Sequence, residues 1–91
     1  MPKVILWDEE KNRRLIEERG LSFEAVEAAL EDGRALDDRP HPNQEKYRNQ
    51  RILVVEIDGY ACVVPYVDNP DSWFLKTIYP SRKAQRIYLG G

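Results

Sequence analysis

The chain has 91 residues, of which 42% are hydrophobic and 33% are charged, so it can form one small domain spanning residues 1–91. Its longest apolar run without a charge, residues 60–67, is far shorter than the roughly 20 residues of a membrane-spanning helix, and its first residues are too polar for a secretory signal. The net charge of −2 argues against a generally basic nucleic-acid coat protein, and one cysteine with one histidine excludes an internal disulfide and a zinc site. We therefore expect a cytoplasmic domain that uses no metal and no other cofactor.

The N-terminal residues predict a strand followed by a helix. Residues 3–7, with the sequence KVILW, form a short apolar run of the kind found in buried strands. Asp8 is a suitable N-cap, and the acidic residues after it favour a helix N-terminus because they complement the helix dipole. This helix extends to about residue 19, where Gly20 can adopt the left-handed conformation that closes a helix.

A second helix and a polar segment follow. Ser22 can cap a helix over residues 23–31, whose apolar side chains fall on one stripe. The stripe consists of Phe23, Val26, Ala29 and Leu30. The residues from Arg34 to Gln50 are mostly polar and predict a loop, with room for a short strand near Ala35 to Asp38.

The clearest local pattern is a β-hairpin. Residues 51–57 (RILVVEI) and 60–67 (YACVVPYV) are rich in β-branched and aromatic side chains, and Asp58-Gly59 separates them. An Asp-Gly pair in this position favours a two-residue type I′ turn. Pro65 has no N–H to donate, so we expect its strand to lie at a sheet edge there or to bend.

The C-terminal residues predict a third strand and a last helix. Residues 68–71 form a turn, residues 73–79 (WFLKTIY) continue the meander, and Pro80-Ser81 begins a helix through Tyr88, with Gly90-Gly91 as a frayed end. The order of the elements predicts an α+β domain. Two N-terminal helices and one C-terminal helix are expected to pack on one face of a mostly antiparallel sheet.

Two chemical features leave two interpretations each, and a third leaves one. Residues 72–91 contain four cations and no carboxylate, and so can bind phosphate or an acidic partner, or can form a solvated helix suited to its own dipole. His41, between two prolines, is either a general acid or base or a solvated loop residue. Cys62, inside a strand among valines, is expected to be a small buried hydrophobe.

The residue types that remain are Arg, Lys, Tyr and His, without a Gly-rich phosphate loop or a nucleophile elbow. This set suits metal-independent cleavage of RNA through the ribose 2′-hydroxyl, because cations can stabilise the charge that builds on the phosphorane oxygens. Arginine binds phosphate in a bidentate manner, and tyrosine can stack on a base or move a proton. A protein-binding module would contain the same residue types.

Three motifs carry a family resemblance. Residues 6–12 (LWDEEKN) resemble the apolar-W-D-x-x-K-N opening of BrnT-type toxins, and residues 20–24 (GLSFE) resemble their G-(V/I)-S-F-E step between two helices. Residues 80–84 (PSRKA) with Tyr88 are similar to their closing helix. The three motifs occur in the family's order, and the resemblance covers nearly the whole chain.

The resemblance implies a small RelE-like α+β fold and a ribonuclease toxin of a bacterial type II toxin–antitoxin system, which inhibits growth by cutting RNA. It also implies a cognate antitoxin with a ribbon–helix–helix DNA-binding domain. The operator DNA would be bound only through that antitoxin, and no membrane partner is implied.

Carried over residue by residue, the resemblance gives Arg82 the role of a phosphate clamp at the start of the last helix, with Lys83 beside it. Lys11 matches the first motif, and it can either face the site or be an ordinary helix lysine. The expected catalytic residues are Arg82, Lys83, Lys11 and His41, and the expected RNA-binding residues are Lys76, Arg51, Tyr47 and Tyr88.

Two other hypotheses come from different functional classes. The chain can be a non-catalytic interaction module that binds an antitoxin-like partner, which accounts for its acidic pI of about 5.4 and for Glu18-Arg19 in place of the family's Lys-His pair. It can also be an RNA-binding regulator that stacks bases on strand aromatics. Alternation along the strands divides those aromatics between two faces, so most of them are expected in the core. They are Tyr60, Tyr66, Trp73 and Phe74.

Overall fold

The computed structural model describes residues 3–90, and every predicted helix and strand is present in it. The elements are, in chain order, β1 (Val4–Leu6), α1 (Glu9–Arg19), α2 (Phe23–Glu31), β2 (Ala35–Pro40), β3 (Gln50–Ile57), β4 (Tyr60–Asp68), β5 (Ser72–Leu75), β6 (Tyr79–Pro80), α3 (Arg82–Ala84) and the π-helical turn η1 (Gln85–Leu89). Gly90 closes the last helix with φ 71°, and the expected frayed end at Gly91 lies outside the described residues.

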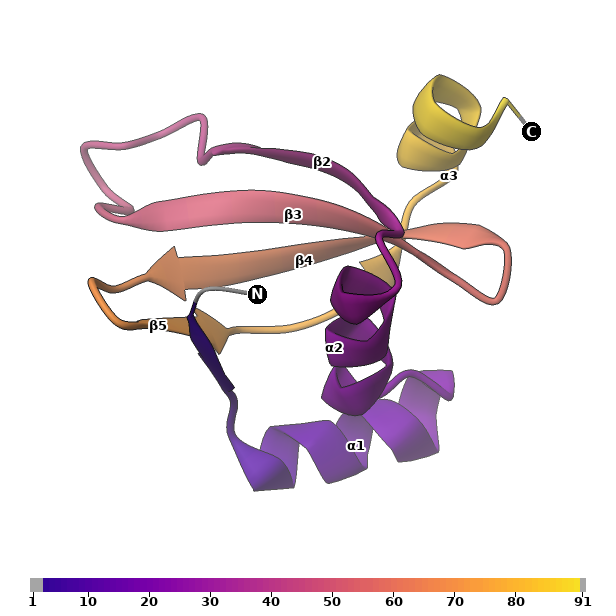
Figure 1. Ribbon diagram of the computed structural model, residues 1–91, viewed down its shortest axis with the longest axis horizontal. Helices are drawn as coiled ribbons and strands as arrows, with labels where there is room; N and C mark the ends of the chain where they lie inside the picture. Colours follow the sequence, from indigo (N-terminus) through magenta and orange to yellow (C-terminus); the bar gives the residue numbers. More distant parts are fainter. Residues whose placement is uncertain (1–2, 91) are drawn as a thin grey trace.

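One mixed sheet organises the molecule. Its strands lie in the order β1-β5-β4-β3-β2, with β6 also paired to β4, and only the contact of β1 with β5 is parallel (Figure 1). The predicted α+β fold with a mostly antiparallel sheet is confirmed. The short strand near Ala35 is confirmed too, and it extends to Pro40.

The hairpin at the centre of the sheet forms as predicted. Strands β3 and β4 pair from Gln50 with Val67 to Ile57 with Tyr60. The turn residue Asp58 has φ 52° and Gly59 has φ 79°, and positive φ at both central positions defines the type I′ turn.

Side-chain caps fix the helix starts at the predicted residues. The Asp8 carboxylate accepts a hydrogen bond from the Glu10 N–H at 2.9 Å, and the Ser22 hydroxyl accepts one from the Ala25 N–H at 3.1 Å. Ser81 caps α3 in the same way. These bonds satisfy N–H groups that have no partner inside their own helix.

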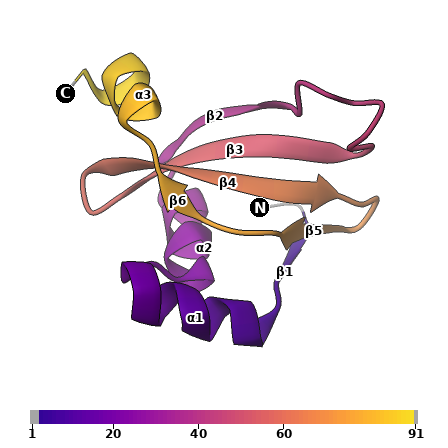
Figure 2. The same cartoon turned by 180° about the vertical axis from the view of Figure 1, so that it is seen from behind.

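The helices cover both faces of the sheet, so the expectation that all of them pack on one face is wrong. Helices α1 and α2 cover the first face, where Leu15, Phe23 and Val26 belong to the main core. The C-terminal helix covers part of the second face, where Ala84 packs with Val54 in a smaller cluster. In both views α1 and α2 lie on the opposite side of the molecule from α3 (Figures 1 and 2).

The expectation of a buried first strand is also wrong. Ile5 packs against the main core, but Val4 is 61% exposed and Leu6 is 46% exposed. These two side chains alternate with Ile5 and therefore point to the second face, which the C-terminal helix does not cover near β1.

The predicted strand over residues 73–79 is divided into β5 and β6, both of which pair with β4 (Figure 2). Between them, the Pro65 carbonyl accepts a hydrogen bond from the Lys76 N–H at 2.8 Å. Strand β4 lies inside the sheet, but Pro65 stands opposite this interruption. The missing N–H of Pro65 therefore removes no ladder hydrogen bond, even though β4 is an inner strand of the sheet.

Candidate functional site

A groove of about 430 Å³ lies on the second face of the sheet, against the C-terminal helix. Its floor is aliphatic and comes from β3 and β4, and its rim carries three side chains that can bear positive charge. The floor consists of Ile52, Val54 and Val63, the rim contains Arg39, His41 and Lys83, and the remaining lining residues include Tyr79, Ser81, Ile87 and Tyr88.

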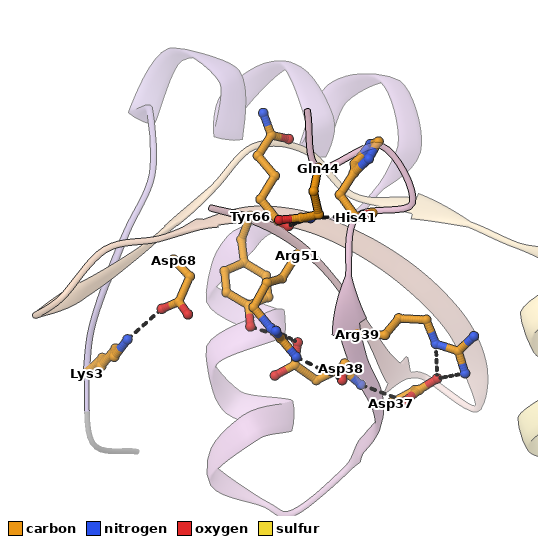
Figure 3. A network of polar contacts seen from close by, with 10 residues as sticks. Lys3, Asp37, Asp38, Arg39, His41, Gln44, Arg51, Tyr66 and Asp68 are labelled. Atoms are coloured by element: carbon orange, nitrogen blue, oxygen red, sulfur yellow. Dashed lines mark hydrogen bonds and ion pairs between the residues drawn. The ribbon is translucent and has the colours of Figure 1, made fainter. Parts of the chain in front are cut away.

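Strand alternation brings Arg39 and His41 to this groove. Arg39 pairs with Ile52 of β3, and His41 follows two positions later and continues the ladder through its N–H bond to the Gln50 carbonyl at 3.0 Å. Asp38, which precedes Arg39 and pairs with Leu53, points to the first face, where Arg51 binds it (Figure 3).

A polar cluster ties β2 to the C-terminal helix beside the groove. Asp37 Oδ2 accepts hydrogen bonds from the Tyr88 hydroxyl and from Arg39 Nε, the second at 2.8 Å. Arg39 Nη2 lies 2.6 Å from the same oxygen and also donates to the Tyr88 hydroxyl at 3.2 Å. Figure 3 shows Arg39 and Asp37 turned toward each other on β2.

These contacts set the protonation of the cluster. The hydrogen bond from Tyr88 lowers the pKa of Asp37, with further help from the Asp38 N–H and the Arg39 guanidinium. The same bond raises the pKa of Tyr88, because ionisation would place two negative charges together. Tyr88 therefore acts as a hydrogen-bond donor to Asp37 in the folded chain.

The loop after β2 fixes the His41 ring. The Asn43 N–H donates to His41 Nδ1 at 3.0 Å, and the ring packs on Tyr47 with centroids 4.3 Å apart. Because Nδ1 accepts a hydrogen bond, this geometry assigns the proton of the neutral ring to Nε2. His41 thus offers the groove an N–H donor.

The groove brings together some of the predicted site residues. His41, Lys83 and Tyr88 line it directly, and Tyr47 supports the His41 ring. The cation of Lys83 comes from α3, whose start Ser81 fixes by capping.

The other predicted site residues lie elsewhere. Lys11 belongs to α1, which lies on the opposite side of the molecule from α3 (Figure 1), and it does not line the groove. Arg51 points to the first face and donates to Asp38 at 3.0 Å. Arg82 and Lys76 are exposed and do not line the groove.

Sequence reasoning missed Arg39, Tyr79 and Ser81 as groove residues. The detectable signal was alternation: had the strand after residue 34 been extended to Pro40, Arg39 and His41 would have fallen on one face. Tyr79 reaches the groove only because β6 separates from β5, and no local pattern indicates that break.

The first two sequence motifs, residues 6–12 and 20–24, contact each other within the fold. The Trp7 ring stacks on Phe23 at 5.6 Å between centroids. Asn12 is buried, accepts a hydrogen bond from the Phe23 N–H at 2.8 Å and donates to Glu24 at 2.7 Å. These residues therefore fasten α1 to α2, away from the groove.

Residues 3–90 contain no group of three or more His, Cys, Asp or Glu side chains placed to hold a metal ion. Within the same range, no helix is long and apolar enough to cross a membrane. Cys62 is buried, and this burial raises the pKa of its thiol, so it is a core residue as expected.

The fold and the groove define a small α+β protein with two helices on one sheet face and, on the other, a groove lined by Arg39, His41 and Lys83. Residues 8–80 match the family described as a domain of unknown function, DUF4258, and the chain therefore belongs to that family. The match includes Arg39, His41 and Tyr79 but ends before Lys83 and Tyr88. No curated protein matches the chain.

Proposed function

We propose that the protein is a metal-independent endoribonuclease and the toxin of a type II toxin–antitoxin pair, with its site in the groove beside the C-terminal helix. One observation carries this proposal: Arg39, His41 and Lys83 converge from β2, its following loop and α3 around an aliphatic floor. Cations on a rim suit a phosphodiester, and an apolar floor suits the face of an unpaired base.

The reaction is an in-line attack of the ribose 2′-oxygen on the adjacent phosphorus. The bond to the 5′-oxygen breaks, and the products are a 2′,3′-cyclic phosphate and a 5′-hydroxyl. Water takes the 2′-hydroxyl proton and returns one to the 5′-oxygen. Arg39 and Lys83 offset the charge that builds on the phosphoryl oxygens, and His41 Nε2–H donates a hydrogen bond to one of them.

Expression of the chain alone in a bacterial host tests this function. Growth should stop and transcripts should be cut, and His41→Ala should relieve both effects. His41→Gln should retain more toxicity than His41→Ala, because a glutamine amide can donate from nearly the position of Nε2. Normal growth with intact RNA and soluble protein would reject the proposal.

The partner belongs to the same proposal. A cognate antitoxin with a ribbon–helix–helix domain would neutralise the protein in the cytoplasm and would carry the pair to operator DNA. Support comes from the three motifs that resemble those of BrnT-type toxins. Co-expression with the product of the adjacent reading frame should restore growth.

A second candidate is a non-catalytic module that binds an antitoxin-like protein. The observation that favours it is the exposed apolar surface of the edge strand β1, where Val4 and Leu6 lie open on the second face. If the chain binds the neighbouring gene product and RNA stays intact in cells that express the chain, these results would favour this module over the ribonuclease.

A further inference from the structure

We infer that Asp37 and Tyr88 are positioning residues that hold the Arg39 guanidinium at the groove with one end free to bind a phosphate oxygen. This inference rests on the proposed function, because it assigns the arginine that engages the scissile phosphodiester. It names residues that neither the residue types nor the family motifs single out for this role.

The hydrogen-bond pattern of Arg39 supports this role. Its Nε and Nη2 face Asp37 Oδ2 at 2.8 and 2.6 Å, and Nη2 also donates to the Tyr88 hydroxyl. Within residues 3–90, Nη1 forms no hydrogen bond, so its N–H donors remain available. The Arg39 side chain is 65% exposed whereas that of Asp37 is 22% exposed. The carboxylate that holds Arg39 is therefore mostly covered, and the guanidinium is open to solvent.

A free arginine on a surface samples many rotamers and loses that freedom when it binds a ligand. Asp37 restrains the Arg39 guanidinium before any ligand arrives, and Tyr88 restrains Asp37 through the hydrogen bond from its hydroxyl. Preorganised donors of this kind stabilise developing charge without reorganising during the reaction.

The neighbouring residue on β2 provides a matched internal control. Asp38 accepts hydrogen bonds from the Tyr66 hydroxyl at 2.8 Å and from Arg51 Nε at 3.0 Å. It thus binds one tyrosine and one arginine, as Asp37 does, but on the other face of the sheet. Tyr66 belongs to the main core, so that trio supports the fold and lies away from the groove.

Tyr88→Phe is the informative change, since it removes one hydroxyl and leaves the charge of the groove unchanged. Replacing Asp37 would also remove a carboxylate and strengthen the positive potential. Inorganic phosphate is titrated into wild-type, Tyr88→Phe, Tyr66→Phe and Arg39→Ala protein. The NMR signals of the Arg39 Nε–H and of the His41 backbone amide report its binding.

Wild-type and Tyr66→Phe proteins should bind phosphate equally, and Tyr88→Phe and Arg39→Ala should bind it about tenfold more weakly. Adding Tyr88→Phe to Arg39→Ala should cause no further loss, because Tyr88 acts through Arg39. The Arg39 Nε–H signal should be sharp in the wild-type chain and broadened in Tyr88→Phe.

Equal phosphate binding by wild-type and Tyr88→Phe proteins would overturn the inference. It would also be overturned if Tyr88→Phe weakened phosphate binding as much in the Arg39→Ala protein as in the wild-type protein. RNA cleavage by the same proteins tests the proposed function separately. A chain that binds phosphate in this Tyr88-dependent manner and leaves RNA intact would retain the inference and reject the ribonuclease.

Discussion

Asn12 joins the two N-terminal helices through both ends of its side-chain amide. Its oxygen accepts from the Phe23 N–H, which has no partner inside α2, and its nitrogen donates to Glu24. A buried polar group of this kind is stabilising only while every bond is made.

Asn12→Ala should lower the free energy of unfolding by about 1–3 kcal/mol, because the Phe23 N–H would stay buried without an acceptor. Denaturant midpoints measure this loss. The exposed neighbour on the same helix supplies the control, since Arg13→Ala should change the free energy by no more than about 0.5 kcal/mol. Equal midpoints for Asn12→Ala and the wild-type chain would show that the amide does not fasten α1 to α2.

Asp37 should make stability depend on pH in acid. Its pKa is lowered below the ordinary value of 3.8, so the folded chain binds fewer protons than the unfolded chain in that range. Its contribution is fully present above pH 3.8 and is lost as the pH falls through the lowered pKa.

Denaturant midpoints measured from about pH 5 to pH 2 should therefore fall less steeply for Asp37→Asn than for the wild-type chain. Asp71→Asn, in an exposed turn, should keep the wild-type slope. Parallel curves for the wild-type and Asp37→Asn proteins would contradict the assigned hydrogen bond from Tyr88.

The role of single residues was the hardest feature to predict from sequence. Asp8, Ser22 and Gly20 act at the predicted helix ends because capping depends on nearby backbone atoms. Arg39 and Tyr88 meet across 49 positions of the chain, and no local pattern encodes such a contact.

At the scale of elements, the type I′ turn between β3 and β4 requires a positive φ at two consecutive residues. Gly59 has φ 79° with no neighbouring atom within 4 Å of an added Cβ, so substitution there meets conformational strain alone. The turn fixes the register of the hairpin that supplies the groove floor.

Gly59→Ala should lower the free energy of unfolding by about 1–2 kcal/mol, because an L-residue is disfavoured in the left-handed region. Asp58→Asn should be tolerated within about 0.5 kcal/mol, since asparagine is enriched at positive φ. Thermal or denaturant unfolding of both variants gives the comparison. Equal stability of the Gly59→Ala and wild-type proteins would contradict the assigned turn.

Elements with strong local signals were predicted well, and those set by tertiary contacts were not. The hairpin and both N-terminal helices match their predicted bounds closely. The division of the third strand lies opposite Pro65, whose carbonyl binds the Lys76 N–H from 11 positions earlier in the chain. The exposure of β1 depends on how far the C-terminal helix reaches over the second face.

At the scale of the whole molecule, the sheet separates a structural face from a chemical one. The first face carries the main core under α1 and α2, together with the contact between the motifs of residues 6–12 and 20–24. The second face carries the groove, to which the cationic C-terminal helix contributes Lys83. Sequence reasoning identified the cations of residues 72–91 but could not place them, because it expected all helices on one face.

The most direct test is incubation of the purified chain with single-stranded RNA in the presence of a chelator. We predict cleavage to 2′,3′-cyclic phosphate and 5′-hydroxyl ends, roughly 100-fold slower in Lys83→Ala. Lys11→Ala, which removes a cation from the other side of the sheet, should cut at the wild-type rate. Intact RNA with the wild-type chain, or equal losses in Lys83→Ala and Lys11→Ala, would contradict a ribonuclease site in this groove.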